Sequence, residues 1–147
     1  MPMKILKHLV GHLVHPSDST TPATVGEVQK SEERIPDSTL SRVEEAVEAW
    51  KEGGGHLQAG LSLPRAAEAI GVPRYLLSAW LKQQGQHYSD WLTTLRISEA
   101  MLVLRTHPDW SNETVARHCG FSDRTYFQRK FKQITGLTPS NFLKQHT

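Results

Sequence analysis

Apolar residues recur at helical spacing along most of this chain. The clearest stripe follows steps of three, four and three residues and consists of Leu40, Val43, Val47 and Trp50. A second stripe, after a Gly-Val-Pro turn, consists of Leu76, Leu77, Trp80 and Leu81. The longest apolar segment covers residues 89–106 and ends at "HPDW", and no alternation of period two persists over a strand's length. The sequence therefore predicts an all-α fold.

Capping residues and glycines mark the ends of these helices. The residues placed to cap a first turn are Asp37 or Ser38, Ser62, Ser89, Ser111, Ser122 and Thr138. The triplet "GGG" at 53–55 ends the first helix, and Gly85 ends the helix that precedes residue 89. Gly71 and Gly120 each stand between two short helical segments, where a tight turn requires a positive φ.

The stretch "CGFSDRTYFQRKFKQITGLTPSNF" (119–142) interleaves aromatic and basic residues. On a helix capped by Ser122, the residues predicted to face inward are Tyr126, Phe127, Phe131 and Ile134. Those predicted to lie largely elsewhere are Arg124, Gln128, Arg129 and Lys132. The aromatic residues are interpreted as core and the cations as a solvent or ligand face.

The two helix pairs repeat each other. Ser62, Ala67 and Gly71 match Ser111, Ala116 and Gly120 at a constant offset of 49 positions. A capped helix, a small alanine facing its partner, a glycine turn and a second helix form the pattern of a helix-turn-helix. Two stacked helical hairpins without a ligand are the alternative, and the two copies, the long helix between them and the basic half favour the helix-turn-helix.

Charge and composition indicate which parts of the chain could meet a partner and which classes of protein are excluded. Residues 1–56 carry six Lys/Arg against nine Asp/Glu, whereas residues 57–147 carry eleven against six, so a basic half follows an acidic one. Residues 16–37 are rich in Ser, Thr, Pro and charge and are interpreted as a linker. The single cysteine excludes an internal disulfide, and no apolar run reaches the roughly 20 residues of a membrane span. No signal peptide is recognised, and a cytoplasmic location is expected.

The segment "VARHCGFSDRTYFQRKFKQITGLTPSNF" resembles the second helix-turn-helix signature of the AraC/XylS family of bacterial transcription regulators. "WLTTLRISEAMLVL" resembles that family's linker helix, whose R-[IL]-x-x-A element is here Arg96, Ile97 and Ala100. The resemblance covers roughly residues 40–143. It implies a unit of about seven helices, with two helix-turn-helix subdomains joined by a long central helix and a recognition helix from each entering a major groove.

The expected organisation places an N-terminal extension or linker, poorly ordered, at 1–36 and a DNA-binding domain at 37–147. Within that domain the first repeat covers about 57–88, the linker helix 89–106 and the second repeat about 110–143. The N-terminal "MKILKHLVGHLV" is open to several interpretations: an amphipathic dimerisation or membrane-surface helix, the remnant of a longer protein, or a frayed terminus.

The DNA contacts predicted for the second repeat are Arg124, Thr125, Gln128, Arg129 and Lys132, because Arg and Lys can donate to guanine and Gln can pair with adenine. The corresponding residues of the first repeat are Arg74, Tyr75, Ser78 and Lys82. Ser78 and Ala79 are shorter than the side chains that family members commonly carry there, and "NFLKQHT" lacks the arginine that many have after the aromatic residue. Base reading is therefore expected mainly from the second repeat.

No catalytic residue, cofactor or metal site is predicted. His8, His12 and His15 share a helical face but lack a nearby fourth ligand. Cys119 is interpreted as core filler, and the glutamates at 44, 45 and 48 as solvated charge.

The predicted function is that of a sequence-specific double-stranded-DNA-binding transcription regulator, or its isolated DNA-binding region, and not an enzyme. RNA polymerase is a second expected partner. A homodimer, or an effector domain on a chain portion absent here, stays open, since 39 residues before the first helix are too few to form a sensing domain. The alternative is a helical adaptor of the same fold that binds a protein partner, favoured by the weakly basic first recognition helix.

Overall fold

The structure is a computed structural model that describes residues 34–146. Its elements are α3 (Asp37–Glu52), the 3₁₀ turn η2 (Gly55–Leu57), α4 (Leu63–Ile70), α5 (Arg74–Gln83), α6 (Tyr88–Thr106), α7 (Asn112–His118), α8 (Arg124–Thr135) and α9 (Pro139–Gln145). The described part contains helices and no strand, so the predicted all-α class is confirmed. The proposed extension at 1–36 and the histidines at 8, 12 and 15 lie wholly or almost wholly outside the described residues.

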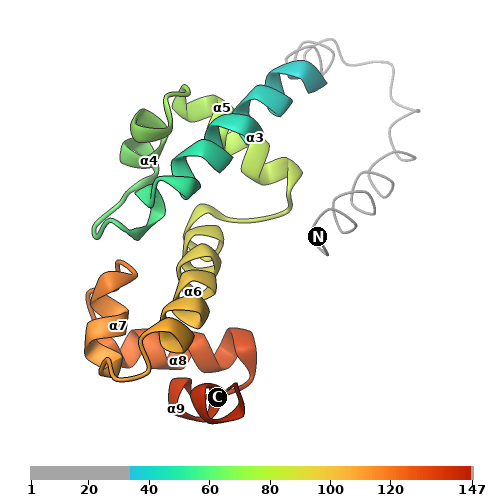
Figure 1. The fold of residues 1–147 in the computed structure, drawn as a ribbon. Coiled ribbons are helices and arrows are strands. Elements are labelled where there is room, and N and C mark those ends of the chain that lie inside the picture. The colour runs from blue at the N-terminus through green and yellow to red at the C-terminus, as the bar shows by residue number, and fades with distance from the viewer. Residues whose placement is uncertain (1–33, 147) are drawn as a thin grey trace, which may run out of the picture.

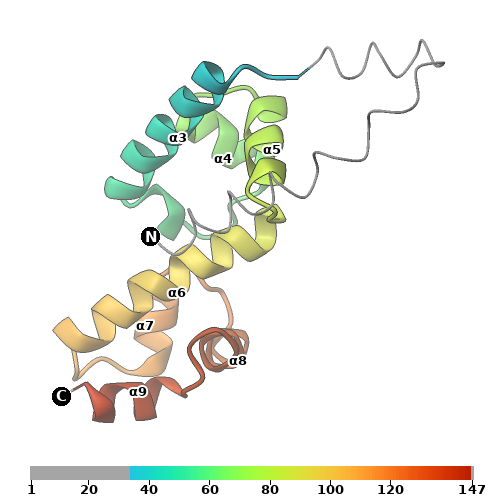
Figure 2. The same ribbon diagram turned by 90° about the vertical axis from the view of Figure 1, so that its right-hand side faces the viewer.

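The helices form two lobes along one central helix (Figures 1 and 2). The first lobe contains α3, α4 and α5, and the second contains α7, α8 and α9. Each lobe has a separate apolar core, and α6 supplies residues to both. Its N-terminal half contributes Trp91 and Leu92 to the first core, and its C-terminal half contributes Ile97, Ala100, Val103 and Leu104 to the second. Because its two halves pack against different partners, the apolar residues of α6 do not form one continuous stripe.

The two helix-turn-helix pairs have matching turns. Gly71 and Gly120 both adopt φ +92°, as predicted from the glycine at each turn. Ala67 and Ala116 are both buried, and their carbonyl oxygens accept a turn N–H from Val72 at 3.1 Å and from Phe121 at 2.9 Å. The internal repeat of the sequence is therefore a repeat of structure.

Side-chain caps fix the starts of four helices. Ser62, Ser111 and Thr138 accept the predicted N–H bonds at 3.4, 3.0 and 3.1 Å. The predicted cap Ser122 is wrong, because α8 begins one residue later and the Asp123 carboxylate accepts the Tyr126 N–H at 2.9 Å. Ser and Asp are about equally good caps, so local preference does not decide between adjacent candidates.

Two other predicted caps are also wrong. α6 begins at Tyr88 after His87, so Ser89 lies inside its first turn, and no side chain caps it. α3 likewise begins at Asp37 after Pro36 without a side-chain cap. At α6 a tertiary contact stands in place of a cap: the Tyr88 hydroxyl donates to the Leu61 carbonyl at 2.6 Å and ties the first turn of α6 to the chain before α4.

The aromatic stripe of α8 is shorter than predicted. Phe127 and Phe131 are fully buried and Tyr126 is half-buried, whereas Ile134 is 42% exposed. Phe142 of α9 packs edge-on against Phe131 at a centroid distance of 5.4 Å. Ile134 belongs to the following turn of α8, which the core leaves uncovered.

Candidate nucleic-acid interface

α8 presents a basic outer face opposite its buried phenylalanines. Arg124, Thr125, Arg129 and Lys132 are exposed as predicted, and Gln128 is half-buried. Together with Lys130, the helix carries four cations and no carboxylate. A shallow groove of about 510 Å³ follows this face and is lined by Thr125, Gln128, Arg129, Lys132, Gln133 and Thr138. The structure thus brings four of the five predicted residues together, while Arg124 stands apart from the groove at the first turn.

Tyr126 organises two of these cations. Its ring lies 5.3 Å from the Arg129 guanidinium carbon and 5.6 Å from the Lys130 Nζ. Such contacts with an aromatic face restrain a cation without neutralising its charge. Sequence reasoning missed the role of Lys130, although its place four residues after Tyr126 is a usable signal.

α5 presents a weaker version of the same face. Leu77, Trp80 and Leu81 are buried in the first core, and the predicted residues Arg74, Tyr75, Ser78 and Lys82 are all exposed. Tyr75 is 68% exposed, which makes it the most exposed large apolar side chain of the described part. With two cations against four on α8, α5 offers less positive charge to a polyanion.

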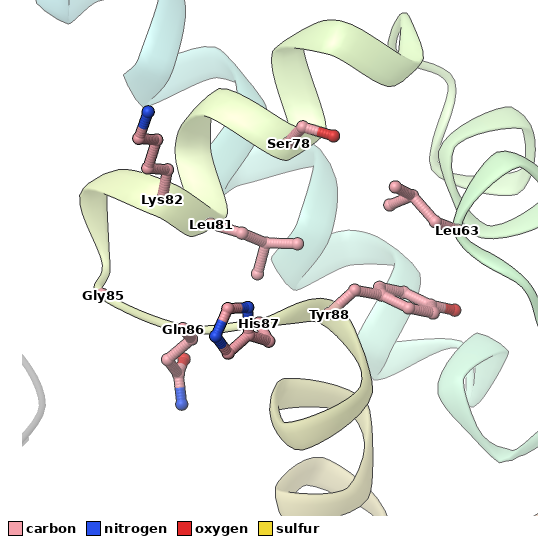
Figure 3. Close-up of a pocket in the computed structure, with 8 residues that line it drawn as sticks. All are labelled: Leu63, Ser78, Leu81, Lys82, Gly85, Gln86, His87 and Tyr88. Carbon is pink, nitrogen blue, oxygen red and sulfur yellow. The ribbon is translucent and has the colours of Figure 1, made fainter.

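A hollow of about 400 Å³ lies between α5 and the start of α6. Its lining includes Ser78, Leu81 and Lys82 from α5 and Gln86 and His87 from the connection to α6. In Figure 3, Leu81 points toward His87, whereas the ends of Lys82 and Gln86 point away from both. Ser78 and Lys82 are therefore brought together, one helical turn apart, whereas Arg74 and Tyr75 lie outside the hollow. Gln86 and His87 were not predicted, and their only sequence signal is their place directly after Gly85.

The cations of α5 and α8 form no ion pair with a carboxylate of the described residues. Within residues 34–146, the ion pairs join Lys51 to Glu48, Arg117 to Glu113, and His118 to Glu99, and none involves α5 or α8. Unpaired cations held on two rigid helices suit a polyanion better than a small apolar ligand.

The described residues offer no comparable arrangement for metal binding or for thiol chemistry. Among the described residues no group of His, Cys, Asp and Glu side chains could hold a metal ion. Burial raises the pKa of the Cys119 thiol to about 12, which keeps it protonated and unreactive in the second core. The glutamates at 44, 45 and 48 line a shallow surface of α3, where Glu48 accepts a bond from Lys51 at 3.2 Å. None of the helices between Arg34 and His146 combines the length and apolar character that a bilayer crossing requires.

Residues 66–145, more than half of the chain, match a protein-family model described as a helix-turn-helix domain. The chain belongs to the AraC-type helix-turn-helix family. The AraC-type match runs from within α4 to the end of α9, so it includes both α5 and α8.

Curated and solved relatives agree with this assignment. The chain is 40% identical over 70 residues to the arabinose operon regulatory protein of Escherichia coli, covering 48% of this chain and 24% of that protein. Its fold is similar to the C-terminal domain of the two-component response regulator yesN from Fusobacterium nucleatum, with 26% identity, a TM-score of 0.58, and coverage of 70% of this chain and 98% of that one. It is also similar to the DNA-binding domain of AdpA, solved in complex with a target DNA, at 23% identity and a TM-score of 0.58, covering 71% and 91% of the two chains. The last likeness concerns the fold alone.

The matching region is a small part of the curated relatives. This chain spans between 20% and 30% of the length of the first three of them. The AraC-type family and these relatives are transcription regulators and not enzymes.

The R-[IL]-x-x-A element of the AraC-type linker helix lies in the middle of α6. Ile97 and Ala100 are fully buried in the second core. Arg96 instead turns toward the chain after α3, where its guanidinium donates to two backbone carbonyls. This role of Arg96 was not predicted, because both acceptors lie about 40 residues away along the chain.

Proposed function

We propose that this chain is the sequence-specific double-stranded-DNA-binding region of a transcription regulator. The observation that carries the proposal is the repeated arrangement of α5 and α8. Each is the second helix of a helix-turn-helix, buries its apolar face in its own lobe, and exposes cations that no carboxylate of the described part pairs with. Nucleic-acid backbones are the polyanions that such faces fit.

The length of α6 supports binding by both lobes at once. Nineteen residues span about 28 Å at 1.5 Å per residue. Successive major grooves on one side of B-DNA repeat at about 34 Å, so the two outer helices can reach adjacent grooves with little change of shape.

The two helices have unequal roles in this proposal. The groove of α8 offers Gln128, Arg129 and Lys132, whose amide, guanidinium and ammonium groups can donate to base edges. The exposed face of α5 offers Ser78, which is too short for deep contacts, and Lys82, which reaches a phosphate more readily than a base. The second lobe would then read most of the sequence, while the first adds affinity.

The domain 37–147, with 1–36 as an extension, remains the proposed organisation. RNA polymerase as a second partner, a homodimer, an effector domain elsewhere in the protein and a cytoplasmic location belong to the same proposal.

A second candidate function is a helical adaptor that binds a protein. The observation favouring it is Tyr75, a large aromatic side chain that is 68% exposed on α5 beside the half-buried Leu76. Exposed aromatic residues are common anchors of protein interfaces.

A mobility-shift assay with random-sequence duplex DNA at low salt separates the two functions. A DNA-binding region shifts the duplex at micromolar protein even without its preferred site, because non-specific binding is largely electrostatic. No shift under these conditions would leave the adaptor as the better account.

A further inference from the structure

The Arg96 side chain joins the two lobes at their boundary. Its Nε donates to the His56 carbonyl at 2.9 Å and its Nη2 donates to the Gln58 carbonyl at 2.6 Å. The same guanidinium lies 5.9 Å from the ring centroid of Phe121, at the start of the turn before α8. One side chain of α6 therefore contacts the chain after α3 and the second helix-turn-helix together.

The segment Gly55–Gln58 is anchored on both sides. On the first-lobe side, His56 is buried against the Trp50 ring at a centroid distance of 6.1 Å. The Trp50 indole also covers Gly55 so closely that an added Cβ would overlap it. On the other side, Leu57 packs against the core of the second lobe. The segment thus forms a link between the lobes that is separate from the α6 backbone.

Gly120 differs from its repeat partner Gly71 at this boundary. Both have φ +92°, so both carry the same backbone requirement for glycine. A Cβ on Gly71 would meet nothing within 4 Å, whereas one on Gly120 would lie 2.7 Å from the Leu57 carbonyl oxygen and 2.8 Å from the Arg96 Nε. Position 120 therefore needs glycine for a second reason, which is the close approach of the Leu57 carbonyl.

We propose that Arg96, Gly120 and the segment Gly55–Gln58 form a lobe clasp that fixes the position of α5 relative to α8, and thereby sets the spacing between the two halves of the preferred DNA site. The DNA part of this inference rests on the proposed function. A single helix between two lobes bends and twists, whereas a second link beside it removes that freedom. The planar guanidinium suits this role because it donates to two acceptors at once, which a lysine ammonium at the same position does with poorer geometry.

The first test measures spacing preference. The full chain is assayed against duplexes in which the spacer between the two half-sites is lengthened or shortened by single base pairs. The parent is expected to prefer its best spacer by about tenfold, because a wrong spacer requires the DNA to be deformed. In Arg96→Lys and Gly120→Ala that preference should fall to about threefold or less. In Arg96→Lys the affinity for a lone second half-site should be unchanged, because Arg96 lies outside both helix-turn-helix pairs.

Matched controls separate the clasp from general damage. Gly71→Ala introduces the same backbone strain without the close approach, and Arg105→Lys makes the same exchange at an exposed position of α6. Both should keep the parental spacing preference. An unchanged preference in both clasp variants, or an equal loss in Gly71→Ala and Gly120→Ala, would overturn the inference.

The second test needs no DNA and so stands apart from the proposed function. Spin labels at Tyr75→Cys on α5 and Gln133→Cys on α8 report the distance between the two helices by pulsed electron paramagnetic resonance. Cys119 is buried and stays unlabelled. The parent and Gly71→Ala should give a narrow distribution, and Arg96→Lys a broader one.

The outcomes separate the two claims. If the parent fails to bind DNA, the proposed function fails, and the distance distribution alone decides whether the clasp exists. An equally narrow distance distribution in Arg96→Lys would contradict the existence of the clasp. A broader distance distribution with an unchanged spacing preference would show that the clasp exists but does not set the spacing of the DNA site. Should Gly120→Ala not fold, the Arg96→Lys and Arg105→Lys pair supplies the same comparison.

Discussion

Arg129 and Lys82 are the two cations whose removal separates base reading from phosphate contact. Arg129 lies in the α8 groove with its guanidinium against Tyr126, and Lys82 lies beside the hollow at the end of α5. A guanidinium held in place can donate two bonds to one guanine, whereas an ammonium on a flexible stem acts as a point charge, which suits a phosphate without fixed geometry.

We therefore expect Arg129→Ala to weaken binding of the preferred site by about 1–3 kcal/mol and to relax base preference at one position. Lys82→Ala should weaken binding to all sequences similarly and leave the preferred site intact. Selection from a randomised DNA pool measures both effects. Arg42→Ala, an exposed cation on α3, serves as the control. A changed base preference in the Lys82 variant alone would assign base reading to the first lobe.

Asp123 offers a test of where α8 begins. Its carboxylate accepts the Tyr126 N–H, so Asp123→Ala should lower the free energy of unfolding by about 1 kcal/mol. Ser122→Ala should change it little, because the Ser122 side chain does not cap α8. Denaturant unfolding of the two variants decides the register. The larger loss in Ser122→Ala would show that the helix begins one residue earlier.

At the scale of elements, Phe131 and Ile134 both fit the helical spacing of the α8 stripe, but only Phe131 is packed in the core. Phe131 is fully buried between Phe127 and Phe142, whereas Ile134 is 42% exposed. Phe131→Ala should destabilise the second lobe by about 3–5 kcal/mol, because it removes a buried aromatic ring and leaves a cavity. Ile134→Ala should cost well under 1 kcal/mol. Thermal unfolding compares them, and similar losses would mean that Ile134 also belongs to the core.

The sequence predicted the elements well because their signals are local. Helical spacing located the buried stripes, and three of the predicted caps, Ser62, Ser111 and Thr138, accept their bonds as expected. The positive φ at Gly71 and Gly120 followed from the repeat. All nine predicted contact residues lie on the two outer helices, and six of them lie beside a groove or hollow.

The remaining features depend on contacts between distant parts of the chain. Ile134 satisfies the period of the stripe, yet the core ends one turn earlier. The Tyr88 hydroxyl, which stands in place of a cap at α6, donates to Leu61, 27 residues away. The two carbonyls that bind Arg96 lie 38 and 40 residues from it. Hydrogen bonds between residues so far apart produce no periodic pattern by which a single sequence could predict them.

At the scale of the whole molecule, the proposed boundary near residue 37 predicts a separable domain. Each lobe has its own apolar core built from residues between 34 and 146. Deleting residues 1–36 should therefore leave the melting temperature and the DNA affinity nearly unchanged, as measured by calorimetry and fluorescence anisotropy. A loss of several degrees would show that the deleted segment packs on the domain.

The most direct test of the central claim, that α5 and α8 bind duplex DNA through their exposed cations, is the salt dependence of binding. The two helices carry six Lys and Arg residues, which the proposal places against phosphates and base edges. Neutralising about six phosphates predicts that log K falls with log salt at a slope near −5. Fluorescence anisotropy with a labelled duplex over a range of salt concentrations gives this slope. A steep slope is the predicted result, and a slope flatter than about −2 would contradict binding through these two faces.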